Sequence, residues 1–192
     1  MTELANAIAV PQPRVVRLDD DAPDSRRHAR ERRLARDLVE LSRLQRGHER
    51  AECAPVDLAT LVRAICAEFP QVHIEGPQHL PVSTDSRRLS RVLFAVLENA
   101  YLHGAPPVNV TFDATEIVIK DSGPGVDPGL LPRATEPFVS GERTRGRGLG
   151  LGLAIAAHQA ALLDADLDVS NDAAGGAIAR LRFAAATPPP LG

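Results

Sequence analysis

The sequence lacks the features that would place it in a membrane, an oxidising compartment or a complex with nucleic acid. No run approaches the roughly 18 apolar residues of a membrane span, and the N-terminus lacks a signal peptide's basic and then apolar order. Its two cysteines, Cys53 and Cys66, are too few and too far apart for a disulfide framework or a zinc site, so we expect reduced thiols and a cytoplasmic location. The formal net charge of −3 gives no electrostatic case for nucleic acid.

Lysine is almost absent as well, whereas the overall composition is that of a folded protein. Lys120 is the only lysine among 22 basic residues, which together with the many alanines indicates a high-GC bacterial coding bias. Hydrophobic residues make up 44% and charged residues 24% of the 192 residues, so wholesale disorder is excluded. The length suits one domain with appendages.

The chain divides into four segments by composition. Residues 1–27 contain several prolines and an acidic run, which is typical of a disordered tail. Residues 28–54 predict a helix and a linker, because leucines at three- and four-residue steps form one stripe for a partner helix. The arginines of this segment could form a nucleic-acid arm, but a solvated helical face is the better interpretation. Residues 55–186 have the pattern of a compact α/β unit, and residues 187–192 form a proline-rich tail.

Within this unit the apolar pattern alternates between helical and strand periods. Two helices are predicted to begin after capping residues, at Asp57 and at Asp85 or Ser86, and a third is predicted for residues 149–163. Short strands are predicted for residues 72–74, 80–82, 108–112, 117–119, 167–169 and 178–183. This order of elements predicts a mixed sheet with helices on one face.

Four segments of the unit carry residue types that suit nucleotide chemistry, and two of them follow the second predicted helix. Asn99 and His103 share one face of that helix, where an amide oxygen can ligate Mg²⁺. Asp121, at a strand end, can accept a hydrogen bond from an exocyclic amine such as that of adenine. Gly123 and Gly125 let the backbone approach a flat ring or phosphate. Taken singly, the two segments also fit an ordinary helix end and a capped turn.

The other two segments lie further along the chain. Phe138 precedes a polar loop and can anchor a mobile lid, and Arg143 and Arg145 in that loop can meet phosphate oxygens. Alternate glycines over residues 146–152 lead into the third predicted helix and free backbone N–H groups for phosphate at a helix N-terminus. The alternative is a loop-to-helix hinge, and the spacing matches neither a P-loop nor a dinucleotide fingerprint.

In this order the segments resemble the ATP-binding catalytic domain of sensor histidine kinases, in the superfamily that includes gyrase and MutL ATPases. Glu98-Asn99-Ala100 resembles the asparagine box, residues 121–125 the first glycine box, and Glu136-Pro137-Phe138 the phenylalanine box. Residues 148–155 resemble the second glycine box, and Gly175-Gly176 the final glycine turn. The resemblance implies an α/β fold, a two-layer sandwich of a five-stranded mixed sheet and three helices preceded by one long helix.

The resemblance also implies the activity of an ATP-dependent protein histidine kinase of a two-component system, with Mg-ATP beneath a flexible lid. Asn99 would ligate Mg²⁺, and Asp121 would read the adenine amino group. Catalytic roles are implied for Asn99, His103, Arg143 and Arg145. The remaining nucleotide-binding positions that it implies are Gly123, Gly125, Phe138, Gly148, Leu149, Gly150, Leu151 and Gly152.

Partners are implied by the same resemblance. Residues 38–61 resemble the second dimerisation helix of these kinases and its linker. The implied partners are a response regulator, a kinase chain or domain that carries the acceptor histidine, and a second copy of this chain. We expect only a weak homodimer, because a four-helix bundle needs two helices from each chain and only one is predicted here.

The sequence departs from the family pattern in its phosphate chemistry and in its acceptor. Ala95 stands where the family usually has a second asparagine, four residues before Asn99, and a methyl group cannot bind Mg²⁺. Leu102 stands where a basic residue often reaches toward phosphate. His28 is not followed by the acid and proline of family acceptors, so we expect the acceptor on another chain, or lost. Two alternatives stay open: a degenerate nucleotide-binding module without kinase activity, and an anti-sigma-factor-type serine kinase.

Overall fold

The computed structural model describes residues 35, 39, 42, 49–139 and 150–184. Residues 49–139 and 150–184 contain three α-helices and a short 3₁₀ helix: α2 (Leu58–Cys66), α3 (Ser86–His103), η1 (Leu131–Arg133) and α4 (Gly152–Ala161). The strands are β1 (Ala54–Asp57), β2 (Val72–Glu75), β3 (Pro81–Thr84), β4 (Val108–Phe112), β5 (Glu116–Lys120), β6 (Ala165–Asn171) and β7 (Ala177–Phe183).

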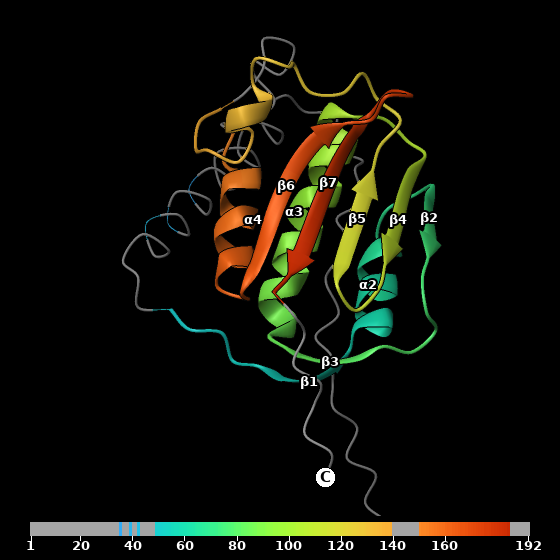
Figure 1. The fold of residues 1–192 in the computed structure, drawn as a ribbon, viewed down its shortest axis with the longest axis vertical. Helices are drawn as coiled ribbons and strands as arrows, with labels where there is room; N and C mark the ends of the chain where they lie inside the picture. The colour runs from blue at the N-terminus through green and yellow to red at the C-terminus, as the bar shows by residue number, and fades with distance from the viewer. Residues whose placement is uncertain (1–34, 36–38, 40–41, 43–48, 140–149, 185–192) are drawn as a thin grey trace, which may run out of the picture.

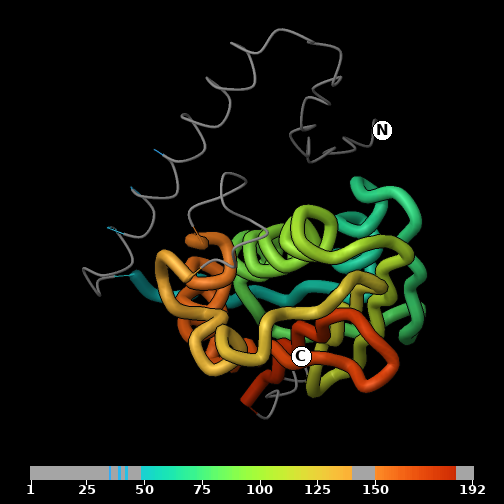
Figure 2. The backbone as a smooth tube through the Cα atoms, turned by 90° about the horizontal axis from the view of Figure 1, so that it is seen from above, coloured from blue at the N-terminus to red at the C-terminus, as the bar shows by residue number. Residues whose placement is uncertain are grey.

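Five of the strands form one mixed sheet, and the three α-helices cover a single face of it (Figure 1). The strand order is β2-β4-β5-β7-β6, in which only the β2–β4 pair is parallel. Seen from above, helices and sheet form two layers (Figure 2). The predicted fold class, a two-layer sandwich of a five-stranded mixed sheet and three helices, is confirmed.

The N-terminal part of the predicted organisation lies mostly outside the described residues. This applies to the tails at residues 1–27 and 187–192, and to most of the predicted helix and linker at residues 28–54. Of that helix, residues 35, 39 and 42 are described and are helical. The predicted linker ends in a strand, because β1 begins at Ala54 and pairs antiparallel with β3 in a separate two-stranded sheet.

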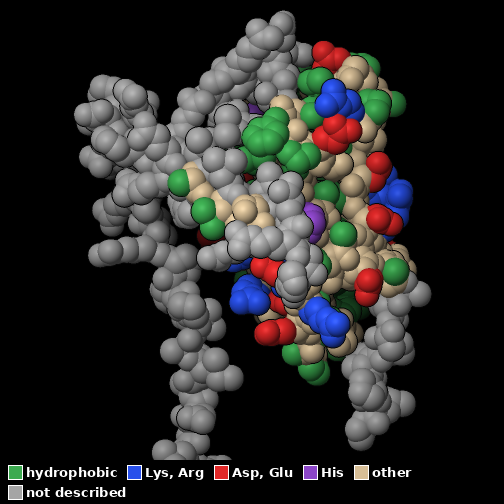
Figure 3. Space-filling view, turned by 90° about the vertical axis from the view of Figure 1, so that its left-hand side faces the viewer, with side chains coloured by type: hydrophobic (Ala, Val, Ile, Leu, Met, Phe, Trp, Pro, Cys, Tyr) green, Lys and Arg blue, Asp and Glu red, His purple; other side chains and the backbone are tan. Residues whose placement is uncertain are grey.

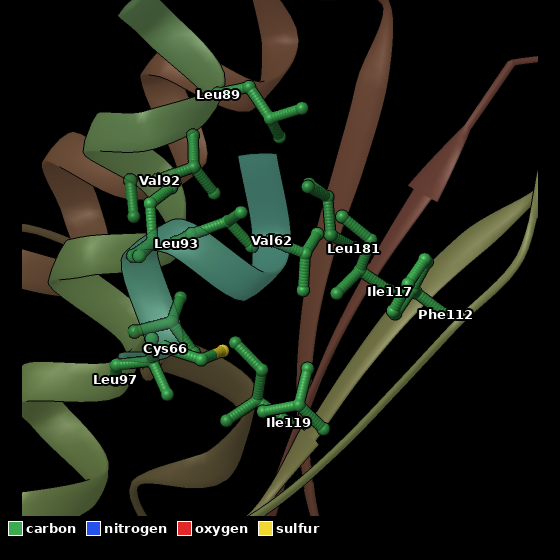
Figure 4. Packing of buried hydrophobic residues seen from close by; sticks show 14 of the residues in the cluster. Val62, Cys66, Leu89, Val92, Leu93, Leu97, Phe112, Ile117, Ile119 and Leu181 are labelled. Carbon is green, nitrogen blue, oxygen red and sulfur yellow. The ribbon is translucent and has the colours of Figure 1, made fainter. Parts of the chain in front are cut away.

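The core lies between α3 and the inner face of the sheet. In β4 and β5 every second side chain is buried, as their alternating sequences predicted. The apolar stripe of α3 meets these residues, and Figure 4 shows Leu89, Leu93 and Leu97 facing Ile117 and Ile119. Each fully buried aliphatic side chain of this kind contributes about 1.5–3 kcal/mol. This packing fixes where α3 ends, and α3 carries two of the predicted site residues.

Both predicted helix caps are confirmed. Asp57 accepts the backbone N–H of Ala59 at 3.0 Å and so caps α2. Asp85 caps α3, because its Oδ1 accepts the N–H of Arg87 and of Arg88, each at 3.1 Å. Burial alone would raise the pKa of Asp85, but hydrogen bonds from backbone N–H groups and the nearby arginines outweigh it and lower the pKa.

Arg88, in the first turn of α3, is buried and joins three parts of the chain. Its side chain donates to Glu49 at 2.9 Å, to the carbonyl of Arg50 at 3.1 Å and to Oε1 of Gln159 at 2.8 Å. Its Nε lies 3.3 Å from Oδ2 of Asp85. Gln159 is fully buried on α4. The network therefore fastens the segment before β1 to both α3 and α4.

The third helix begins later than the sequence predicts. The expected range was residues 149–163, whereas α4 runs from Gly152 to Ala161. Gly150 has a φ of +69°, in the left-handed region, so a right-handed helix cannot continue back through it. None of the described helices is long and apolar enough to cross a membrane.

Candidate nucleotide-binding site

Asp121 lies directly after β5 and is buried, with 4% of its surface exposed. Its Oδ1 accepts the backbone N–H of Gly123 at 2.7 Å and that of Ala177 at 3.3 Å. Its own N–H donates to the carbonyl of Ala177 at 3.0 Å. The carboxylate is thus held between the end of β5 and the start of β7. Among the described residues both of these bonds to the carboxylate reach Oδ1, and neither uses Oδ2.

Three glycines pack around Asp121 so closely that no side chain fits. A Cβ at Gly104 would lie 2.3 Å from Cγ of Asp121, and a Cβ at Gly176 would lie 2.0 Å from the Asp121 carbonyl oxygen. A Cβ at Gly123 would lie 2.5 Å from Cα of Gly104. These three positions therefore have to be glycine for the segments around Asp121 to pack together.

Gly104 is a residue whose role sequence reasoning missed. A glycine just after a helix suggests a left-handed C-cap, but Gly104 has φ −92° and ψ −147°. The glycine is needed for space beside Asp121, which lies 17 positions later in the sequence. No local pattern signals such a contact.

The loop after Asp121 is fixed by Asn171, the last residue of β6 and a second residue that was not predicted. Val126 N–H donates to Oδ1 of Asn171, and Nδ2 of Asn171 donates to the Val126 carbonyl, both at 2.7 Å. Gly125 has a φ of +74°, and a Cβ there would lie 2.7 Å from Oδ1 of Asn171. Gly125 is therefore required for backbone conformation as well as for space.

The end of α3 carries Asn99 and His103, which are both half-buried and lie one turn apart. The α3 end is joined to the Asp121 loop, because the N–H of Ser122 donates to the carbonyl of Ala105 at 2.8 Å. Ala95, one turn before Asn99, is partly buried against the core. In the part of the chain that the structure describes, no group of three or more His, Cys, Asp or Glu side chains could hold a metal ion.

Phe138 closes the glycine-rich loop through its backbone. Its N–H donates to the carbonyl of Gly150 at 3.0 Å, and a Cβ at Gly150 would lie 2.2 Å from the carbonyl oxygen of Val139. Phe138, which the sequence predicts as the anchor of a lid, is 61% exposed and has a backbone φ of +65°. Leu151, by contrast, is buried against Ile155.

Gly152 begins α4; among the described residues no side chain caps this N-terminus, and a Cβ at Gly152 would meet nothing within 4 Å. The first backbone N–H groups of an α-helix have no partner within the helix, and such an N-terminus favours an anion. The predicted positions Arg143, Arg145, Gly148 and Leu149 lie outside the described residues. On this side of the molecule, charged side chains of both signs are interspersed among hydrophobic ones (Figure 3).

A comparison with known families agrees with this geometry. The model of the family described as "Histidine kinase-, DNA gyrase B-, and HSP90-like ATPase" matches residues 84–187, more than half of the chain. The chain belongs to this ATPase family. The matched span of the ATPase domain runs from the end of β3 past β7, so it contains every described part of the candidate site.

Within the ATPase family, the relatives of this domain are sensor kinases. The sensor protein CseC of Streptomyces coelicolor is 41% identical over 152 residues, which cover 78% of this chain and 30% of CseC. The signal transduction histidine-protein kinase AfsQ2 of the same organism is 32% identical over 166 residues, 82% of this chain and 31% of AfsQ2. The ATPase domain thus spans about 30% of the length of these curated relatives. The predicted family is confirmed, and the chain is an ATP-binding catalytic domain of the sensor histidine kinase type.

Solved structures lead to the same conclusion. Full-length ShkA in complex with AMPPNP aligns with a TM-score of 0.67 and 26% identity, over 88% of this chain and 38% of ShkA. The mycobacterial sensor histidine kinase MprB aligns with a TM-score of 0.56 and 25% identity, over 71% of this chain and 99% of that structure. Both solved structures share the fold of this domain.

Proposed function

We propose that this domain binds Mg-ATP between the Asp121 loop and the end of α3, and transfers the γ-phosphoryl group to a histidine on another chain or domain. The observation that carries the proposal is the buried Asp121 carboxylate, held by backbone N–H groups and surrounded by glycine backbone. Oδ2 of Asp121 would accept a hydrogen bond from the adenine amino group. Gly123 and Gly125 would shape the pocket for the ring.

The phosphate end of the site would lie between α3 and the N-terminus of α4. The open N–H groups at Gly152 would favour phosphate charge. His103, Arg143 and Arg145 would add positive charge or hydrogen bonds. The loop positions Gly148, Leu149 and Gly150, together with Leu151, would let the backbone approach the phosphates, and Phe138 would close the loop.

The residues of this site fit Mg²⁺ only if the nucleotide supplies further oxygen ligands from its phosphates. Asn99 offers one amide oxygen, and Mg²⁺ commonly takes one or two protein ligands with phosphate oxygens and waters completing its octahedron. When bound there, Mg²⁺ would neutralise charge on the phosphates. The protein's own contribution would be to position the γ-phosphoryl group for attack by an imidazole nitrogen.

The partners follow from the relatives, which are named as sensor proteins and histidine kinases. We infer a response regulator as the receiver of the phosphoryl group and a histidine-bearing kinase chain or domain as its donor. A weak homodimer would form through the segment at residues 28–54. A degenerate nucleotide-binding module is the second candidate, and Ala95 is the observation that favours it.

The proposed activity can be tested with radiolabelled ATP, Mg²⁺ and the separately expressed dimerisation domain of a sensor histidine kinase. We expect an acid-labile, alkali-stable label on that domain, as for phosphohistidine. An acid-stable label would indicate a serine kinase instead. Binding of ATP without any label on the dimerisation domain would contradict the proposed transfer and favour the degenerate module.

The Ala95→Asn variant tests whether a missing oxygen ligand limits the chemistry. Position 95 lies one turn before Asn99 on α3, so the new amide would share its face. We expect the Mg²⁺-dependent part of ATP affinity to rise about fivefold, which corresponds to about 1 kcal/mol. Calorimetry with and without Mg²⁺ measures this.

Ala95→Leu is the matched control, because it adds similar volume without an oxygen. If both variants lower the melting temperature and neither gains Mg²⁺ dependence, the asparagine amide is buried without a partner. Such burial costs about 1–3 kcal/mol. That result would contradict the hypothesis that an asparagine at position 95 supplies a missing Mg²⁺ ligand.

A further inference from the structure

The turn between β6 and β7 lies beside the loop that follows β5, and hydrogen bonds join the two. Asn171 ends β6 and Ala177 begins β7, and the two residues are paired across the hairpin. Within the turn, the N–H of Asp172 donates to the carbonyl of Gly176 at 3.0 Å. Outside it, the carboxylate of Asp172 lies 2.6 Å from Nζ of Lys120. The turn is therefore closed on itself and held against the end of β5.

We propose that Asn171 is a positioning residue for the nucleotide, which holds the segment from Gly123 to Val126 in its binding conformation. This inference rests on the proposed function of the Asp121 site. The side-chain amide engages both polar groups of the Val126 backbone at 2.7 Å, across 45 positions of sequence. Only asparagine and glutamine carry a side-chain amide, with an N–H donor and a carbonyl acceptor on one carbon, and glutamine is one carbon longer.

The loop needs the hydrogen bonds to Asn171 because of its backbone conformation. Gly123 is held by its hydrogen bond to Asp121, but the chain beyond it turns through Gly125, whose φ is +74°. Glycine has the largest conformational freedom of any residue, so the loop would sample many states without an anchor. With Asn171 in place, Oδ1 lies over Gly125 and the amide fixes Val126. The ligand then meets a preformed surface and does not have to order it.

The hydrogen bonds between Asn171 and Val126 are exposed. Their loss can therefore change nucleotide binding without changing the stability of the fold. Asn171 is exposed and Val126 is half-buried, so water replaces these bonds when the loop opens. The core beneath, with Ile119 and Leu181, does not depend on this contact. Loss of the Asn171 amide therefore opens the loop locally while the domain stays folded.

The inference is tested with Asn171→Ala and Asn171→Asp, using ADP with Mg²⁺ as the probe. Aspartate keeps an acceptor for the Val126 N–H but turns a carboxylate oxygen toward the Val126 carbonyl, so it does not replace the amide. We expect about a tenfold loss of ADP affinity for both variants by calorimetry. The melting temperature without nucleotide should stay within about 2 °C of the wild type, and hydrogen exchange at Val126 should accelerate.

Asn109→Ala is the matched control, since Asn109 is an exposed asparagine in β4 on the open face of the sheet. It should change neither affinity nor exchange at Val126. Unchanged ADP affinity in Asn171→Ala would overturn the inference, as would a melting temperature that falls in proportion to the lost binding. If the wild-type chain itself fails to bind ADP, the proposed function is overturned and this inference with it.

Discussion

Replacing Asp121 by asparagine is expected to lower the affinity for ADP by roughly 10- to 100-fold while the domain stays folded. Hydrogen bonds to charged groups contribute about 1.5–3 kcal/mol, and each 1.4 kcal/mol is a factor of ten in affinity. Asparagine keeps an oxygen that accepts the N–H of Gly123, which preserves the loop. Its NH₂ group then replaces Oδ2 and opposes the donor on adenine. Isothermal calorimetry with ADP and with GDP measures the loss and the base selectivity.

Asp113→Asn is the control for this substitution, because it makes the same chemical change at the opposite end of β5. Asp113 accepts the N–H groups of Thr115 at 2.6 Å and Glu116 at 3.0 Å in the β4–β5 turn. Its replacement should leave ADP affinity within twofold of the wild type. Equal binding of ADP and GDP by the wild-type chain, or an unchanged affinity in Asp121→Asn, would contradict the assignment of the adenine site.

Among the substitutions proposed here, Arg88→Ala is expected to cause the largest loss of stability. The free energy of unfolding should fall by about 3–5 kcal/mol. Arg88 is 5% exposed. Removal of its guanidinium leaves the buried carboxylate of Asp85 without this ion-pair partner and the buried amide oxygen of Gln159 without this donor. It also detaches Glu49 and so the segment before β1. Urea denaturation followed by circular dichroism measures the change.

Arg87→Ala is the matched control for Arg88→Ala. Arg87 is the neighbouring residue in the same turn of α3, but its side chain is exposed, and its contact with the cap is made by its backbone N–H. Alanine there should change stability by less than about 0.5 kcal/mol. If Arg88→Ala costs as little as this control, water must replace the arginine in its network, and the network does not hold the segment before β1 in place.

The order of the three α-helices and of the five strands in the main sheet was predictable from the sequence because it depends on local signals, whereas strand β1 was not predicted. Asp57 and Asp85 cap helices by bonds that reach two or three residues along the chain. Strand alternation in β4 and β5 depends on a two-residue period. The boxes around Asn99 and Asp121 were visible for the same reason, since each is a short motif.

The tertiary structure alone decided which distant residues complete these local elements. Asn171 meets Val126 across 45 positions, and Arg88 meets Gln159 across 71. In the sequence, Asn171 resembles a turn residue and Arg88 an exposed charge at a helix start. Gly104 resembles a helix cap, yet its lack of a side chain matters because Asp121 lies against it. Such roles are set by how close two segments come after packing, and no period or motif within either segment encodes that distance.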